Sequence, residues 1–210
     1  MSTTAPLNTG TNALISGNTS FASGNFHGSV SCYTTGINAL APVISPQQPS
    51  DDVAAGPPAL SPLSSLLAVL HSNRAAASLL LSDGVRSLDD ANIAVQIDPH
   101  RCKFHGRCGA ALHFLGRLED ATAAYQRGIA LPGGSEHAGL KEGLAAVLRS
   151  RSSSSSSSDS SRKRPRSPGA DTTISTTTEA LATHLEEFVA DVTSIGNVVR
   201  KKNRNVDELK

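Results

Sequence analysis

Residues 102–131 read CKFHGRCGAALHFLGRLEDATAAYQRGIAL, and this stretch decides the fold. Apolar residues up to Leu112 fall at helical spacing, and Gly116 then interrupts the pattern. From Leu118 to Ile129 apolar residues recur again at intervals of three and four. The stretch therefore predicts two antiparallel helices joined by a tight turn.

An earlier copy of this pattern lies upstream, where Ala91, Val95 and Leu81 correspond to Tyr125, Ile129 and Leu115. The period is about 34 residues, a length typical of helical-hairpin repeats. Such hairpins bury their apolar faces only by stacking, and the concave side of the stack is a binding groove. We therefore predict an all-α fold and a binding function. Leu140, Leu144 and Val147 share a face of a further predicted helix over 136–149, which would cap the stack.

Composition limits the classes of protein to consider. The 210 residues carry a net charge of +1, and only 3% are aromatic, so the core must be built from Ala, Leu, Val and Ile. No apolar run approaches the roughly 20 residues that cross a bilayer. The three cysteines and the absence of a secretory signal indicate reduced thiols. We expect a cytoplasmic protein with neither a membrane nor a nucleic-acid partner.

The remaining segments have different compositions. We expect disorder over 1–9, a Pro- and Ser-rich loop over 43–65, and a disordered Ser/Arg-rich linker over 150–177. Within 178–210, apolar residues at helical spacing predict an isolated amphipathic helix at about 178–202, followed by a tail. This helix is a candidate contact for a second protein.

A family resemblance rests on a larger set of residues: 72–76, Asp98-Pro99, 109–112, 115–121, Tyr125 and 140–144. These stretches resemble the tetratricopeptide repeats of the heat-shock-chaperone-organising, or stress-inducible phosphoprotein, co-chaperones. Upstream, Gly17-Asn18, Phe21, Tyr33 and Gly36 resemble a degenerate first repeat. The distance from Tyr33 to Ala91 exceeds one period, and the excess fits an insertion within the predicted loop. The resemblance implies a domain over 10–149, with repeats at 10–42, 66–99 and 100–134 and a capping helix over 136–149.

The resemblance also implies a ligand and a site. Co-chaperones of this family hold the acidic C-terminal tails of the 70- and 90-kDa heat-shock chaperones in a carboxylate clamp. Four of its five positions match, at Asn18, Asn73, Lys103 and Arg107. The fifth, a lysine in the first repeat, falls at Leu14 or a neighbouring residue, and no lysine precedes Lys103.

The residues support this site on physical grounds. Lys103 and Arg107 are four apart and share a helix face, and Asn73 lies one period before Arg107. Three donors therefore converge on one groove and suit a chain-terminal carboxylate. Loss of one charged hydrogen bond costs on the order of 1.5–3 kcal/mol, so binding should be roughly tenfold to a hundredfold weaker than with a complete clamp.

Other interpretations stay open at this point. A generic stack could bind an internal peptide of another protein, without chaperone involvement. Arg162, Lys163, Arg164 and Arg166 form a basic run suited to nuclear import, and the Arg/Ser tract could itself be the working part of a nuclear regulatory protein. His100, Cys102, His105 and Cys108 are close in sequence but do not share one helix face, which argues against a zinc site. We expect no cofactor, no metal and no catalytic residues.

Overall fold

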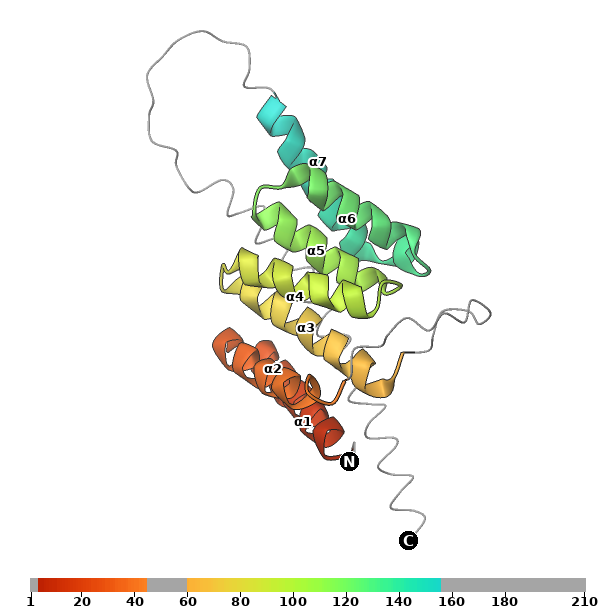
Figure 1. Ribbon diagram of the computed structural model, residues 1–210. Helices are drawn as coiled ribbons and strands as arrows, with labels where there is room; N and C mark the ends of the chain where they lie inside the picture. The colour runs from red at the N-terminus through yellow and green to blue at the C-terminus, as the bar shows by residue number, and fades with distance from the viewer. Residues whose placement is uncertain (1–3, 45–59, 156–210) are drawn as a thin grey trace, which may run out of the picture. The chain divides into compact units, whose positions relative to one another are not determined.

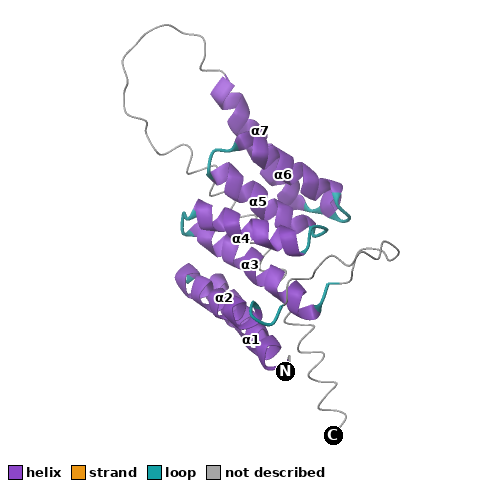
Figure 2. Ribbon diagram, in the orientation of Figure 1, coloured by secondary structure: helices purple, strands orange, loops and turns teal. Residues whose placement is uncertain are grey.

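The computed structural model describes residues 4–44 and 60–155 of the chain. Its helices are α1 (Thr4–Ala22), α2 (Phe26–Leu40), α3 (Pro62–Leu80), α4 (Gly84–Ile97), α5 (Cys102–Phe114), α6 (Leu118–Ala130), the short 3-10 helix η1 (Gly134–Glu136) and α7 (Ala138–Ser155). Within these ranges every regular element is a helix (Figure 2), which confirms the predicted all-α class. None of these helices has both the length and the apolar composition needed to cross a bilayer.

The helices form three hairpins, α1/α2, α3/α4 and α5/α6, which stack in chain order (Figure 1). Each hairpin turns at an equivalent residue with a positive φ, namely Gly24 (78°), Ser82 (63°) and Gly116 (74°). This backbone conformation ends a helix in one residue and lets the chain reverse. The three turns therefore follow the sequence period, although in the second repeat the position is occupied by serine.

Helix α7 covers the α5/α6 hairpin. Leu140 and Val147 of α7 are fully buried in one core cluster with Tyr125 of α6. At Gly143 of α7, the Tyr125 ring occupies the space that a Cβ would need. The last hairpin thus buries its open side against a helix whose residues leave room for the tyrosine, in agreement with a capping role.

The N-terminal helix begins earlier than the sequence predicts. Disorder was expected over 1–9, but α1 is helical from Thr4, so the expectation does not hold for residues 4–9. The Thr11 Oγ1 donates a hydrogen bond to the Leu7 carbonyl at 2.8 Å. A Cβ at Gly10 would approach Leu40 at 2.9 Å and Leu66 at 3.0 Å, so this part of α1 packs closely against its neighbours. Close packing, which composition alone does not reveal, orders the segment.

The second repeat also begins earlier than residue 66. Helix α3 starts at Pro62, inside the predicted loop 43–65, with Ser61 as its N-cap. The Ser61 Oγ accepts a hydrogen bond from the Ser64 backbone N–H at 3.1 Å. Proline stops a helix in its interior but suits the first position, where its missing N–H has no partner in any case. Pro62 therefore begins a helix inside the segment that was predicted to be a loop.

Helix α7 extends beyond the predicted capping helix 136–149. It begins at Ala138 and continues to Ser155, into the segment 150–177 that was expected to be disordered. The Ser150 Oγ donates to the Ala146 carbonyl at 3.1 Å and lies 3.1 Å from the His113 Nε2. These bonds connect the start of the serine tract to the helix. The predicted C-terminal helix 178–202 and the basic run lie outside the described residues.

A glycine–tyrosine contact closes both the first and the third hairpin. Tyr33 of α2 and Tyr125 of α6 are buried, and each ring lies against a glycine of the other helix in its hairpin. A Cβ at Gly17 would overlap the Tyr33 ring, and one at Gly109 would lie 2.8 Å from Tyr125. The missing side chains let each tyrosine pack directly on the facing helix backbone.

A buried charge network joins the first two hairpins. The Arg74 Nε donates to the Asp90 Oδ2 at 2.8 Å and its Nη2 to the Oδ1 at 2.7 Å. The His71 Nδ1 lies 2.8 Å from the same Oδ1, and the Arg74 Nη1 donates to the Thr34 Oγ1 at 2.9 Å. One arginine of α3 therefore connects α2 and α4.

Asp90 stays ionised in this network although it is buried. Burial raises the pKa of its carboxyl group, but the hydrogen bonds and charges of Arg74 and His71 outweigh that effect, and the net pKa is lowered. A lowered folded-state pKa contributes stability above the ordinary pKa of an aspartate. That contribution is lost as the pH falls through the folded-state value.

We predict that Asp90→Asn lowers the free energy of unfolding by about 3 kcal/mol at pH 7, because it leaves a half-buried arginine without its carboxylate. The difference from the native chain should shrink as the pH falls from about 4, the ordinary pKa of an aspartate, toward the lowered folded-state pKa of Asp90, because only the unfolded chain binds the proton in that range. Urea denaturation followed by circular dichroism measures both effects. Asp89→Asn is the matched control, because Asp89 is the exposed neighbour on the same helix. Equal effects of the two variants would contradict the assigned role of Asp90.

Candidate functional site

Asn18 of α1 connects the first two hairpins. Its side chain is 4% exposed. Its Oδ1 accepts a hydrogen bond from the Tyr33 hydroxyl at 2.8 Å and another from the Asn73 Nδ2 at 3.1 Å. Two of the four residues that the sequence selected, far apart along the chain, are thus in direct contact.

These two hydrogen bonds fix how the Asn18 amide is turned. Its carbonyl oxygen has two lone pairs, and two donors occupy them. The remaining hydrogen-bonding group of the Asn18 side chain is its amide Nδ2, which is a donor. The local network therefore uses the acceptor of Asn18 for internal structure.

Arg107 lies on α5 within electrostatic reach of both buried tyrosines. Burial raises the pKa of the Tyr33 hydroxyl well above its usual range, and the positive charge of Arg107 opposes that rise. The same two influences act on the pKa of Tyr125. Arg107 is thus within electrostatic reach of the tyrosine that holds Asn18, and the Arg107 Nε atom is itself buried. Burial in a low-dielectric site strengthens the attraction of a guanidinium for an anion.

Lys103 precedes Arg107 by one turn of α5 and is half-buried. Residues four apart project from the same side of a helix. The two cations predicted from the sequence therefore lie on one side of α5, and the two asparagines are provided by α1 and α3.

The fifth position of the expected site has no cation. Leu14 lies one turn before Asn18 on α1 and is only 5% exposed. An apolar side chain covers the place where the resemblance requires a lysine. The charge on this groove therefore comes from α5 alone among the predicted site residues.

Sequence reasoning missed the role of Tyr33, which was assigned only to the repeat pattern. The signal was available in the register of the repeats. Tyr33 is equivalent to Tyr125, but the position equivalent to Asn18 in the third repeat is Ala110. An asparagine facing the tyrosine only in the first repeat indicates a polar pair added to a recurring packing contact.

The four His and Cys residues at 100–108, weighed above as a zinc site, are not grouped as metal ligands in the structure. Among the residues that the structure describes, no three His, Cys, Asp or Glu side chains are grouped as metal ligands. The His105 Nε2 lies 2.9 Å from the Pro99 carbonyl oxygen, and Cys108 contacts the Asn92 Oδ1 at 3.5 Å. The candidate nuclear-import residues lie outside the described ranges.

No family model matches the chain. Among curated proteins, it is 43% identical over 77 residues to the Hsp70-Hsp90 organizing protein of Triticum aestivum, a match that covers 37% of this chain and 13% of the relative. It is 42% identical over 78 residues to small glutamine-rich tetratricopeptide repeat-containing protein 2 of Mycosarcoma maydis, covering 37% of this chain and 22% of the relative. The chain thus matches less than a quarter of either relative's length.

A solved structure has the same fold. The first tetratricopeptide-repeat domain of Spaghetti (RPAP3), bound to the HSP90 peptide SRMEEVD, superposes with a TM-score of 0.53 at 23% identity. The match covers 69% of this chain and 97% of that domain. The stacked hairpins are therefore tetratricopeptide repeats, as the sequence predicted.

We predict that Tyr33→Phe lowers the free energy of unfolding by about 1 kcal/mol, because it removes one donor from the Asn18 Oδ1. The side-chain amide resonances of Asn18 should shift as the amide loses this partner. Tyr125→Phe is the matched control, since its repeat has alanine in place of the asparagine. An unchanged Asn18 amide spectrum in Tyr33→Phe would show that the hydroxyl does not orient this side chain.

Proposed function

Because the chain carries tetratricopeptide repeats like those of the Hsp70–Hsp90-organizing co-chaperones, we propose that it is a non-enzymatic adaptor that binds the acidic C-terminal tails of heat-shock chaperones. The residues that hold the tail are Asn18, Asn73, Lys103 and Arg107. The observation that carries the proposal is the hydrogen bond between Asn73 and Asn18, which unites two of these residues from different repeats.

The chemistry of the groove favours an anionic ligand. Asn18 and Asn73 present amide donors, and Lys103 and Arg107 are donors with a positive charge. A terminal carboxylate offers two oxygens and a negative charge, which suits a planar guanidinium beside a mobile ammonium group. The acidic HSP90 peptide SRMEEVD held by the RPAP3 domain has this chemistry, which supports a ligand of the same class here.

Leu14 weakens the site without changing its preference. An apolar residue contributes no charged hydrogen bond, so we expect an affinity roughly tenfold to a hundredfold below that of a complete clamp. The same residue favours the second candidate function. A scaffold that binds an internal peptide of another protein needs no cation at this corner, and only a requirement for a free C-terminal carboxylate separates the two functions.

Two further parts of the proposal concern segments beyond the described residues. The amphipathic pattern within 178–202 suits a contact with a second protein, which an adaptor requires. The basic run at 162–166 suits recognition by an import receptor, so we propose that the protein also enters the nucleus. Both remain predictions from the sequence.

The first test is fluorescence-anisotropy binding of a labelled SRMEEVD peptide to the full chain. We predict that amidation of the peptide C-terminus and the substitution Arg107→Ala each weaken binding at least tenfold, because each removes one side of a charged hydrogen bond. Arg149→Ala is the control, since Arg149 is exposed on α7.

Two outcomes would count against the tail-binding proposal. Equal affinity for the free and the amidated peptide would favour the scaffold function. Absence of binding by a chain that is helical by circular dichroism would exclude these tails as ligands under the conditions used.

We predict that Leu14→Lys raises the affinity for the same peptide about tenfold. The aliphatic part of lysine can follow the path of leucine and carry the ammonium group into the groove, which adds one charged contact. Leu14→Met is the control, because it has a flexible stem of similar size and no charge. If the lysine variant stays folded and binds no better than the methionine variant, Leu14 does not occupy the missing corner of the clamp.

A further inference from the structure

A cavity of about 250 Å³ opens between α4, α5 and α6. His105, Cys108 and Leu112 line it from α5. At 100° per residue, these three positions lie about 140–200° around the helix from Lys103, which is one of the proposed tail-binding residues. The same three positions lie about 100–160° from Arg107, and none of the proposed tail-binding residues lines the cavity, which is therefore a separate site.

The equivalent position in the preceding repeat is filled. Cys108 and Ala124 occupy, one repeat later, the positions of Arg74 and Asp90. Arg74 and Asp90 form the buried ion pair in the groove between α2, α3 and α4, with N–O distances of 2.7 and 2.8 Å. In the third repeat a thiol and a methyl group replace them. The cavity is thus the space that a guanidinium and a carboxylate fill one repeat earlier.

The wall of the cavity has an apolar part beside polar groups such as Asn92 and His105. Leu88, Val95 and Leu112 contribute side chains to its wall. Burial raises the pKa of the Cys108 thiol to about 11, and the nearby charge of Arg127 only partly offsets this. The thiol therefore stays protonated at neutral pH, and its contact with the Asn92 Oδ1 uses its hydrogen. The apolar part of the wall, with its protonated thiol, suits a hydrocarbon group.

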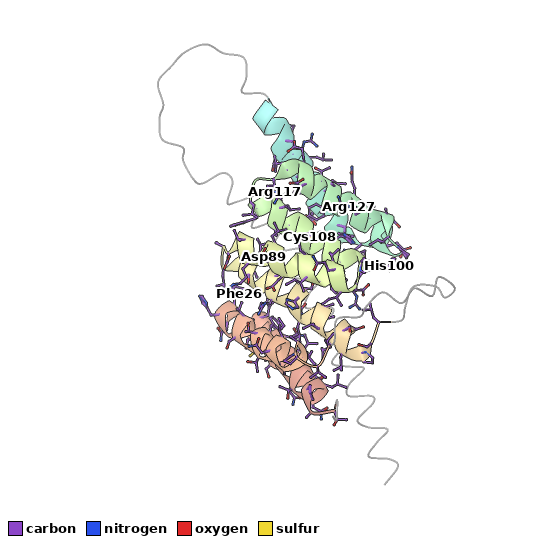
Figure 3. The ribbon with its side chains drawn as sticks, viewed as in Figure 1. Phe26, Asp89, His100, Cys108, Arg117 and Arg127 are labelled. Atoms are coloured by element: carbon purple, nitrogen blue, oxygen red, sulfur yellow. The ribbon has the colours of Figure 1, made fainter. Side chains whose placement is uncertain are left out.

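The rim of the cavity is positively charged. Arg117, the N-cap of α6, and Arg127 on α6 line it together with Asp120, the one carboxylate among the described lining residues. Asp120 is engaged by Arg117, whose Nε and Nη2 lie 2.8 and 2.7 Å from its Oδ2. Figure 3 labels Arg117 at the start of α6, Arg127 on α6 and Cys108 on α5. Because one carboxylate faces two guanidinium groups, Arg127 adds an uncompensated positive charge to this rim.

We propose that this cavity anchors one apolar side chain of an acidic partner polypeptide, with a neighbouring carboxylate of that partner bound to Arg127. The volume supports an anchor for a single side chain, because pockets for whole small-molecule ligands measure about 300–1,000 Å³. Anchoring of one side chain in a well-packed pocket is a common basis of protein–protein contacts. The charge of the rim selects a partner that carries Glu or Asp beside Leu or Phe.

The probe is the acetylated and amidated peptide Ser-Glu-Leu-Glu-Gly-Ser, added to the isotope-labelled full chain and followed by amide chemical shifts. Amidation removes the terminal carboxylate on which tail binding depends. We expect shifts on α4 and α6 around the cavity, with a dissociation constant on the order of 1 mM. The charge-reversed peptide Ser-Lys-Leu-Lys-Gly-Ser should bind at least tenfold more weakly.

Substitutions locate the binding. Arg127→Glu should weaken the acidic peptide at least tenfold, whereas Arg149→Glu, an equal charge change at an exposed site on α7, should have no effect. The double substitution Cys108→Arg with Ala124→Asp copies the ion pair of the preceding repeat into the cavity and should abolish the shifts. Arg107→Ala should leave them unchanged, which separates this site from the proposed tail-binding groove.

Three results would overturn the proposal. These are absence of shifts around the cavity at several millimolar peptide, equal binding of the acidic and basic peptides, and undiminished binding to Arg127→Glu. The Arg127 test remains decisive if the double variant fails to fold, because Arg127 is exposed and contributes no core packing.

Discussion

The close approach of neighbouring helices is the constraint on which the rest of this structure depends. At Gly17 the ring of Tyr33 occupies the space of a side chain, and at Gly36 a Cβ would lie 2.9 Å from Leu70. Larger residues at these positions would push α1, α2 and α3 apart. The 3.1 Å hydrogen bond between Asn73 and Asn18 requires the short separation that the glycines allow. The contact between Asn18 and Asn73, two of the proposed tail-binding residues, thus depends on small residues in the apolar core.

The repeats share a backbone and use it differently. The pair Gly17 and Tyr33 of the first repeat has the counterpart Ala75 and Ala91 in the second, where both alanines are fully buried. A small residue on each helix allows the two helices to pack closely. This hairpin therefore lacks the large aromatic contact that the first and third hairpins have. In the same repeat, the ion pair of Arg74 and Asp90 fills the groove behind α3. Removing one partner of such a pair leaves a buried charge, so the native pair is retained as a unit even where its net contribution is small.

The sequence was informative where a pattern recurs at a fixed period. The regular spacing from Ala91 to Tyr125 predicted the hairpins, and the shared helix face of Lys103 and Arg107 follows from spacing alone. It was less informative at the helix ends, because order from Thr4 and the helical start at Pro62 depend on packing and capping. The bond from Tyr33 to Asn18 was missed because its signal is a difference between repeats, an asparagine that faces the tyrosine only in the first repeat. The cavity behind α5 was missed because it arises from a difference between repeats, and a search for similarity overlooks differences.

The proposed tail-binding groove is asymmetric, and this asymmetry assigns different tasks to its two sides. The cations Lys103 and Arg107 both come from α5, whereas α1 and α3 contribute the neutral amides of Asn18 and Asn73. A charged hydrogen bond contributes about 1.5–3 kcal/mol and a neutral one about 0.5–1.5 kcal/mol. Most of the free energy of binding an anion must therefore come from α5. The amides are held in place by Tyr33 and by each other, so they lose little conformational freedom on binding. Their main effect is on the orientation of the bound anion. A carboxylate that contacted only α5 could approach in many orientations, and the fixed donors on α1 and α3 restrict it to the one in which its second oxygen faces them.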